Sequence, residues 1–169
     1  MAWQMTKTGP IAALAASAVF AGWAGWSWLQ AANDPTLAYV NARDEALQAG
    51  REQVAVLSTL DYHDVQGGIG RWLTASTGPL HDKLASTDDK AKQTLADGKT
   101  VATGKVLDAA VNELDEHAGR AKLLASVEIT VAKEGVAPGT KRNRFAAQLT
   151  RTDDGWKLSA LDQVPVGSR

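Results

Sequence analysis

Hydrophobic residues follow two different patterns along the chain, and the first is an uninterrupted apolar run. No charged residue occurs between Thr8 and Asn33, and the apolar centre extends from Ile11 to Leu29. At ~1.5 Å per residue, a helix of about 20 residues crosses the ~30 Å hydrocarbon layer of a bilayer. We therefore predict a transmembrane helix over residues 10–32, preceded by a short tail of residues 1–9.

Tryptophans gather at the C-terminal end of this run, at Trp23, Trp26 and Trp28. Tryptophan prefers the boundary between lipid and water, so these three side chains are expected at the membrane interface. Small residues also recur four apart, as in Ala18 and Gly22, which lets two such helices approach closely. Self-association through this helix is one alternative; chance pairing in an alanine-rich segment is the other.

The charges around the run predict its orientation. Lys7 precedes it and Asp34 follows it, so the positive-inside rule places residues 1–9 in the cytoplasm and residues 33–169 outside. A cleaved signal peptide is the alternative, but such peptides have a shorter apolar region and end in a small-x-small site. We favour a retained, single-pass anchor in the cell membrane.

Helical spacing of apolar residues follows the anchor. Asp34 and Pro35 provide a cap and a first turn for a helix. Glycine-rich or Thr-Gly-Pro breaks then separate further helical stretches. The predicted helices span Pro35–Leu60, Ile69–Ala75 and Leu80–Asp97.

After Gly98 the hydrophobic period changes to two, which is typical of strands with one buried face. The predicted strands span Val101–Val111, Arg120–Lys133, Lys141–Thr152 and Trp156–Val164. Short turns between them, such as Asp153-Asp154-Gly155, require antiparallel pairing. The amphipathic helices must cover the apolar face of the sheet. The fold class is therefore α+β, with helices packed on a curved antiparallel sheet of about four strands.

Composition narrows the function classes. The 169 residues are 44% hydrophobic, so the domain after the anchor can form a core. The net charge of −1 makes nucleic acid a poor partner. The absence of cysteine excludes disulfides, thiol chemistry and cysteine-based zinc sites. We expect no cofactor.

The histidines do not suggest a metal site. His63, His81 and His117 lack the i, i+4 spacing of a helical zinc pair. His63 lies between Asp61 and Asp64, which is either an acid–base cluster or a polar helix cap, and we favour the cap.

We also expect no enzyme activity. Isomerases of the ketosteroid type need acidic groups and a phenol inside an apolar cavity. The chain has two tyrosines, Tyr39 and Tyr62. The carboxylates expected nearest to the interior of the domain, Asp108 and Asp162, lie near predicted strand ends. The glycine-rich stretch 67–70 follows no strand, so it is not a phosphate loop.

Two groups of side chains are candidates for binding. Trp72, Phe145 and Trp156 line an apolar pocket or fill the core, and the core is favoured. Lys141, Arg142 and Arg144 form a docking face for a partner or for anionic headgroups, or a solvated sheet face. We favour the solvated face.

Several short motifs, in order, resemble one known family. They are Arg43-Asp44-Glu45-Ala46, Leu57-Ser58-Thr59-Leu60-Asp61-Tyr62, Thr77-Gly78-Pro79-Leu80, the helix start at Asp82–Leu84, Ala102-Thr103-Gly104-Lys105-Val106, Arg151-Thr152-Asp153-Asp154-Gly155-Trp156-Lys157-Leu158 and Leu161-Asp162-Gln163-Val164. Together with the anchor, they resemble the Mce-associated membrane proteins of actinobacteria and, more broadly, the NTF2-like fold. A more distant similarity is to the VirB8-like proteins of secretion systems.

The resemblance implies a function without catalysis. It implies an accessory subunit that supports the assembly or stability of an Mce-type lipid import complex, with other envelope transport subunits as partners. A VirB8-like scaffold of a secretion system and a small apolar-ligand-binding NTF2-like protein are the alternatives. In each case residues 33–169 would form an NTF2-like cone outside the cytoplasm.

Overall fold

The computed structural model describes residues 21–23, 26 and 35–165. Contacts divide the chain into two units, residues 1–41 and 42–169. In the first unit, residues 21–23 and 26 are helical, α2 (Pro35–Leu57) begins, and the side chains of Trp23 and Trp26 are exposed. Within the described ranges no helix has both the length and the apolar character needed to span a bilayer. Most of the predicted anchor 10–32, and Trp28 with it, lies outside these ranges.

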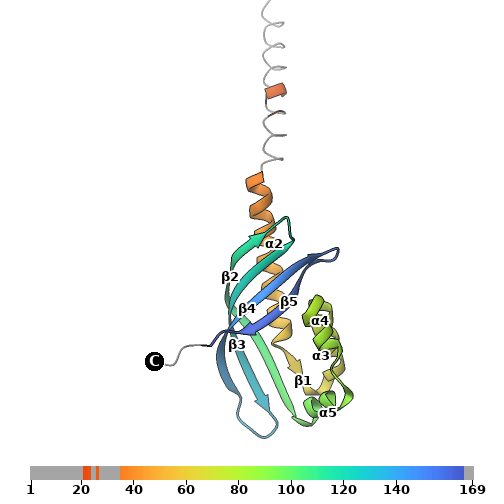
Figure 1. The fold of residues 1–169 in the computed structure, drawn as a ribbon. Helices are drawn as coiled ribbons and strands as arrows, with labels where there is room; N and C mark the ends of the chain where they lie inside the picture. Colours follow the sequence, from red (N-terminus) through yellow and green to blue (C-terminus); the bar gives the residue numbers. More distant parts are fainter. Residues whose placement is uncertain (1–20, 24–25, 27–34, 166–169) are drawn as a thin grey trace, which may run out of the picture. The chain divides into compact units, whose positions relative to one another are not determined.

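The second unit continues α2 into a segregated α+β domain, which confirms the predicted fold class. After α2 come β1 (Leu60–Asp61), the 3₁₀ helix η1 (Tyr62–Asp64), α3 (Val65–Ala75), α4 (Gly78–Ala85), α5 (Asp89–Asp97), β2 (Thr100–Asp115), β3 (Arg120–Lys133), β4 (Gly139–Thr152) and β5 (Gly155–Gln163). The strands form one antiparallel sheet in the order β1-β2-β3-β4-β5. The sheet curls around α2, and the short helices stand beside β1 and β5 (Figure 1).

The sheet has five strands, so the prediction of about four was wrong by one. The missed strand, β1, has two residues, Leu60 and Asp61, which pair with Ala102 and Val101. Two residues are too few to show an alternating pattern, and sequence reasoning had assigned Leu60 to the preceding helix. That helix ends at Leu57 instead, because the backbone at Leu60 is already bonded to β2.

The core lies between α2 and the inner face of the sheet. A row of small residues four apart on α2, comprising Ala42, Ala46, Gly50 and Val54, is buried. A Cβ on Gly50 would lie 2.8 Å from Leu123 Cδ1, so the helix backbone here sits directly on the sheet. The sheet contributes Val111, Ala121, Leu123, Ala125, Val127, Ala147, Leu149, Trp156 and Leu158. Small residues on the helix therefore leave room for branched residues on the strands.

A second close approach joins the end of α2 to β2. The hydroxyl of Thr59 donates to Ala55 O (2.8 Å) and accepts from Gly104 N (3.0 Å). A Cβ on Gly104 would lie 2.2 Å from Ser58 Cβ and 3.0 Å from the Ser58 carbonyl oxygen. Glycine at this position lets the strand pass against the main chain just beyond the helix.

The glycine-rich stretch 67–70 is helical, which corrects the predicted helix start at Ile69. Asp64 caps α3, since its carboxylate accepts from Gly67 N at 2.9 Å. A Cβ on Gly68 would lie 2.4 Å from Leu60 Cδ1, so close packing outweighs the helix penalty of about 1 kcal/mol for each glycine. Glycine here marks tight packing against β1 and a capped helix end.

The helix predicted over Leu80–Asp97 is two helices, α4 and α5. The break falls at Ser86, whose backbone N–H bonds Asp82 O at 3.0 Å, and Asp88 then caps α5 by accepting from Ala91 N at 2.7 Å. Ser-Thr-Asp is a recognisable N-cap signal, and it interrupts a helical pattern that apolar spacing alone would continue.

The outer edge of β2 is irregular. Register shifts fall between Val106 and Asp108 and between Val111 and Glu113, so Leu107 and Asn112 are bulged residues. Beyond Ala102 no strand pairs with this edge in the described part of the chain. Instead, Arg43 Nη2 on α2 donates to Val111 O at 3.1 Å.

Candidate functional site

The three aromatic residues singled out as pocket or core take separate positions. Trp72 on α3 is half-buried, and its indole N–H is shared between Val56 O (3.0 Å) and Thr59 O (3.1 Å). Val56 lies in the last turn of α2, and its carbonyl also accepts from Thr59 N at 3.1 Å, whereas Thr59 follows the helix. The Trp72 indole therefore links α3 to the end of α2 by hydrogen bonds.

Phe145 on β4 is half-buried against the core cluster. It also borders a hollow of about 410 Å³ on β2, β3 and β4, with Leu124, Ser126 and Arg144 beside it. Leu124 is 49% exposed, whereas its chain neighbour Leu123 is 1% exposed on the core side. Residues of both sheet faces line the hollow, since Ala125 and Phe145 belong to the core side and Leu124 and Ser126 to the other.

Trp156 at the start of β5 belongs to the core and is 5% exposed. Its carbonyl oxygen accepts a hydrogen bond from the side-chain amide of Gln53 on α2. The indole nitrogen of Trp156 and the amide oxygen of Gln53 are both buried, and neither has a hydrogen-bond partner within the described ranges. A buried polar group left unpaired costs ~1–3 kcal/mol.

A groove of about 720 Å³ runs beside this pair, which we call the α2–α3 groove. Its walls are α2, α3 and the turn between β4 and β5. Gln53 and Val56 line it from α2, Gly70 and Thr74 from α3, and Trp156 from β5. A second hollow of about 540 Å³ shares Thr74, Asp154 and Lys157 with it, so the depression continues toward His81 at the start of α4.

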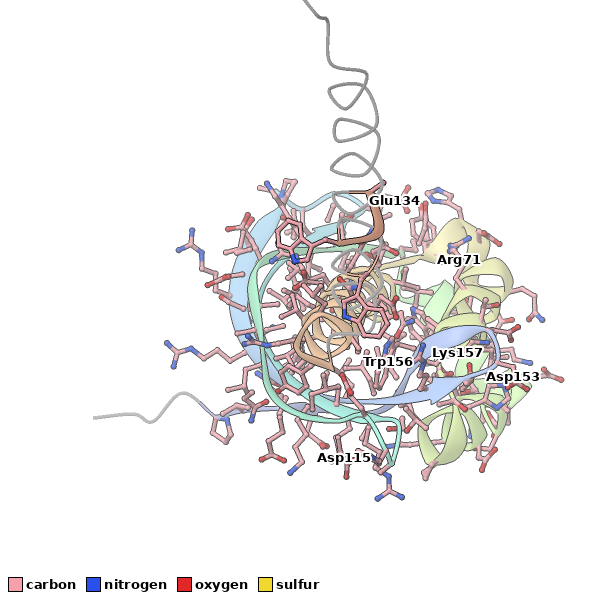
Figure 2. All side chains as sticks on the ribbon, turned by 90° about the horizontal axis from the view of Figure 1, so that it is seen from above. Arg71, Asp115, Glu134, Asp153, Trp156 and Lys157 are labelled. Atoms are coloured by element: carbon pink, nitrogen blue, oxygen red, sulfur yellow. The ribbon has the colours of Figure 1, made fainter. Side chains whose placement is uncertain are left out.

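Both basic residues at the mouth of the groove are paired with acidic neighbours, and Glu52, which also lines the groove, accepts a hydrogen bond from the Gln48 side-chain amide at 3.3 Å. Arg71 Nη1 lies 3.3 Å from Asp64 Oδ2, and Lys157 Nζ lies 3.1 Å from Asp154 Oδ2. Figure 2 shows Arg71 on α3 and Lys157 on β5 on the side of the domain where the short helices lie. Paired charges at an exposed rim give little net field, and Glu52 adds a carboxylate on the α2 side of the groove.

The three basic residues of the proposed docking face do not share a face. Arg142 and Arg144 stand opposite Glu128 and Ser126, on the side of the sheet away from the core. Lys141 stands opposite Ile129, a core-side position, because side chains alternate along a strand. The grouping of Lys141 with the two arginines was therefore wrong. Arg142 Nε also bonds Glu128 Oε2 at 3.3 Å, which reduces the charge this face offers to a partner.

The Asp61–Asp64 segment is a pair of helix caps, as predicted. Asp61 caps η1 by accepting from His63 N at 2.9 Å, and its Oδ1 lies 2.7 Å from His63 Nδ1. The backbone N–H of His63, then its ring, lower the pKa of Asp61 from the ordinary 3.8. The Asp61 side chain is partly exposed and both causes come from His63, so this is a local capping effect. Among the described residues no three His, Asp or Glu side chains gather as a metal site would require.

Asp108 and Asp162 do not enter the core side of the sheet. Asp108 pairs with Ser126 and Asp162 with Ala146, and both carboxylates are exposed on the far face. Sequence reasoning missed Gln53 and the α3 residues that line the groove, among them Gly70 and Thr74. The missed signal is the spacing of Gly67, Gly70 and Thr74, which puts small residues on one side of a helix.

Solved structures share this architecture, which is a VirB8-like, NTF2-like fold. An IcmL-like type IV secretion system protein from Legionella pneumophila aligns with a TM-score of 0.60 at 10% identity, covering 75% of this chain and 95% of that one. The periplasmic domain of DotI gives 0.58 at 11%, covering 71% and 93%. The VirB8 protein of Agrobacterium tumefaciens gives 0.54 at 10%, covering 72% and 92%. At these identities the likeness establishes the fold.

The sequence itself identifies the family. The chain belongs to the family described as uncharacterized protein Rv1363c/MT1408-like, whose profile matches residues 6–165. None of the curated proteins compared with the chain matches it.

Proposed function

We propose that this chain is a non-catalytic scaffold subunit of a multi-protein assembly in the cell envelope. In this proposal residues 10–32 anchor it in the membrane and residues 33–169 lie outside the cytoplasm. The observation that carries the proposal is the fold, which is shared with components described as type IV secretion proteins and with a domain described as periplasmic. The charge-free run from Thr8 to Asn33 supports the anchor.

A second candidate assembly is an Mce-type lipid import complex. The order and spacing of the motifs between Arg43 and Val164 favour it, since they resemble Mce-associated membrane proteins. The shared fold favours a secretion-type scaffold more directly. Both candidates predict the same topology and the same absence of catalysis, and they differ in the identity of the partners.

Topology is testable with a single introduced thiol, because the chain has no cysteine. Val136, exposed in the turn between β3 and β4, is replaced in Val136→Cys, and Thr6 in the tail is replaced in Thr6→Cys. In intact cells a membrane-impermeant maleimide should label the cysteine at 136 and leave the cysteine at 6 unlabelled until lysis. Labelling of position 6 alone, or of neither position before lysis, would contradict the proposed orientation.

Partner identity is testable by purification of the tagged full-length chain from crosslinked membranes of its own host. Secretion-system subunits in the eluate would support the first candidate, and Mce-type subunits the second. A chain truncated after Asn41 removes the second unit and serves as the control, and it should recover neither set. Recovery of neither set by the full-length chain would remove the support for a scaffold.

A further inference from the structure

We propose that two copies of this chain pair face to face through the outer side of the sheet, around a two-fold axis that runs along β3. The outer side is the face turned away from α2. This pairing rests on the proposed function, because it makes the unit of the scaffold a pair of chains held in one membrane. The order of side chains across β2, β3 and β4 carries the inference.

Two rows of outward-facing side chains cross the sheet, and each row is centred on β3. The first row is Asp108 on β2, Ser126 on β3 and Arg144 on β4, and the second is Ala110, Leu124 and Ala146. In the first row an acidic and a basic residue therefore stand one strand away from β3, on opposite sides of it. In the second row two alanines flank a leucine that is 49% exposed.

A two-fold rotation about β3 turns this order into a self-complementary contact. It places β2 of one copy over β4 of the other, so Asp108 meets Arg144 of the second copy, and the symmetry gives two such ion pairs. Leu124 meets Leu124 of the second copy, and the alanines beside it are small enough for the two sheets to approach closely. Members of both rows line the hollow of about 410 Å³, which leaves room for the leucine of the second copy.

The direction of the axis suits two chains anchored in one membrane. Arg43 in the first half of α2 bonds Val111 O on β2, and Thr59 just beyond the helix bonds Gly104 N on the same strand, so α2 runs alongside β2. Figure 1 shows the helix lengthwise within the curled sheet. Rotation about an axis along the strands therefore keeps α2 of both copies pointing the same way. An axis across the strands would point the two helices in opposite directions.

The neighbouring rows limit the size of the contact. In one of them Lys105 and Arg142 flank Glu128, so the axis sets two basic residues against each other, although Arg142 is paired with its own Glu128. Facing sheets also twist away from each other beyond the centre of their contact. The contact is therefore small, and it depends on the high local concentration of chains confined to one membrane. Chains diluted in detergent are expected to be single.

The test uses the full-length chain in membranes of its own host, with one introduced thiol, since the chain has no cysteine. Ser126→Cys puts the thiol on the proposed axis, where packed sheets lie ~10 Å apart, so a short bismaleimide suits the gap better than a disulfide. This variant should form crosslinked pairs. Val136→Cys, at a position that is 62% exposed in the turn between β3 and β4, is the control for random collision and should crosslink far less.

Charge reversal separates the proposed pairing from any other contact at this face. Arg144→Asp sets carboxylate against carboxylate across the axis, and Asp108→Arg sets guanidinium against guanidinium. Each change alone should lower the crosslinking of Ser126→Cys about tenfold, because two ion pairs are lost at once. Both positions are exposed, so the fold tolerates the changes. When the two variants are made with different tags in one cell, opposite charges meet again, and crosslinks should reappear only between unlike chains.

Equal crosslinking at positions 126 and 136, crosslinks that survive either single reversal, or a mixture that joins like chains as readily as unlike ones would each overturn the pairing. The scaffold function is tested separately by the recovery of partner subunits. If the chain recovers partners but forms no crosslinks at position 126, the pairing fails and the scaffold stands as a single chain. If the crosslinks follow the charges as expected but no partner is recovered, the pairing stands and the scaffold fails.

Discussion

Replacing Leu123 by alanine is expected to lower the free energy of unfolding by about 2–5 kcal/mol, the range for removing a buried leucine from a packed core. Leu123 is 1% exposed, and its Cδ1 lies where a Cβ on Gly50 would be only 2.8 Å away. The helix row against it consists of small residues, which cannot extend to fill the space. The cavity therefore stays open and the cost falls toward the upper part of the range.

Leu124 provides the matched control, because it is the next residue on the same strand and points the other way. Its side chain is 49% exposed, so Leu124→Ala should cost about 1 kcal/mol or less. The measurement is urea unfolding of the full-length chain in detergent, followed by far-ultraviolet circular dichroism. Equal losses in the two variants would mean that the sheet face assigned to the core is wrong.

Replacing Gly104 by alanine is expected to be the most damaging single-methyl change, at about 3 kcal/mol. The added Cβ would lie 2.2 Å from Ser58 Cβ and 3.0 Å from the Ser58 carbonyl oxygen. A flexible side chain can move aside, but this obstacle includes main-chain atoms between α2 and β1. Relief requires β2 to move away from the end of α2, which breaks the bond from Gly104 N to Thr59 Oγ1.

Gly139→Ala is the control for this change, since it also adds one methyl to a strand glycine. A Cβ on Gly139 would meet nothing within 4 Å, and its φ is not left-handed. Alanine should leave stability within about 1 kcal/mol, and the restriction of the unfolded chain favours a small gain. Both variants are compared by thermal and urea unfolding. A Gly104→Ala protein as stable as Gly139→Ala would contradict the close approach of β2 to α2.

The strands could be predicted from the sequence because one face of the sheet is buried. The alternation of Ala121, Leu123, Ala125 and Val127 with mostly polar neighbours predicted β3 with both ends correct. The same reasoning correctly predicted antiparallel neighbours joined by short turns. It missed β1, because two residues carry no period, and the break between α4 and α5, because a cap signal was outweighed by apolar spacing.

The candidate groove was largely hidden from sequence reasoning. The sequence marks Trp156 as a large apolar residue, but the residue that bonds its backbone carbonyl, Gln53, lies 103 positions earlier in the chain. Nothing local marks Gln53 among the polar residues of α2. The glycines of α3 were visible, yet they were taken for a loose connection, since glycine in a helix interior is ordinarily unfavourable. The packing of Gly68 on Leu60 and the Asp64 cap on Gly67 N, both visible only in the structure, stabilise this helix.

The bulges at Leu107 and Asn112 have a consequence for how copies of the protein behave when crowded. A straight, unpaired edge would be a template on which a neighbouring sheet could continue. Two bulges interrupt the spacing of hydrogen-bonding groups along that edge, and Arg43 already occupies the carbonyl of Val111. Even at high local concentration, copies of the protein should therefore resist edge-to-edge pairing of their sheets into fibrils. Contacts between copies would then be made by side chains.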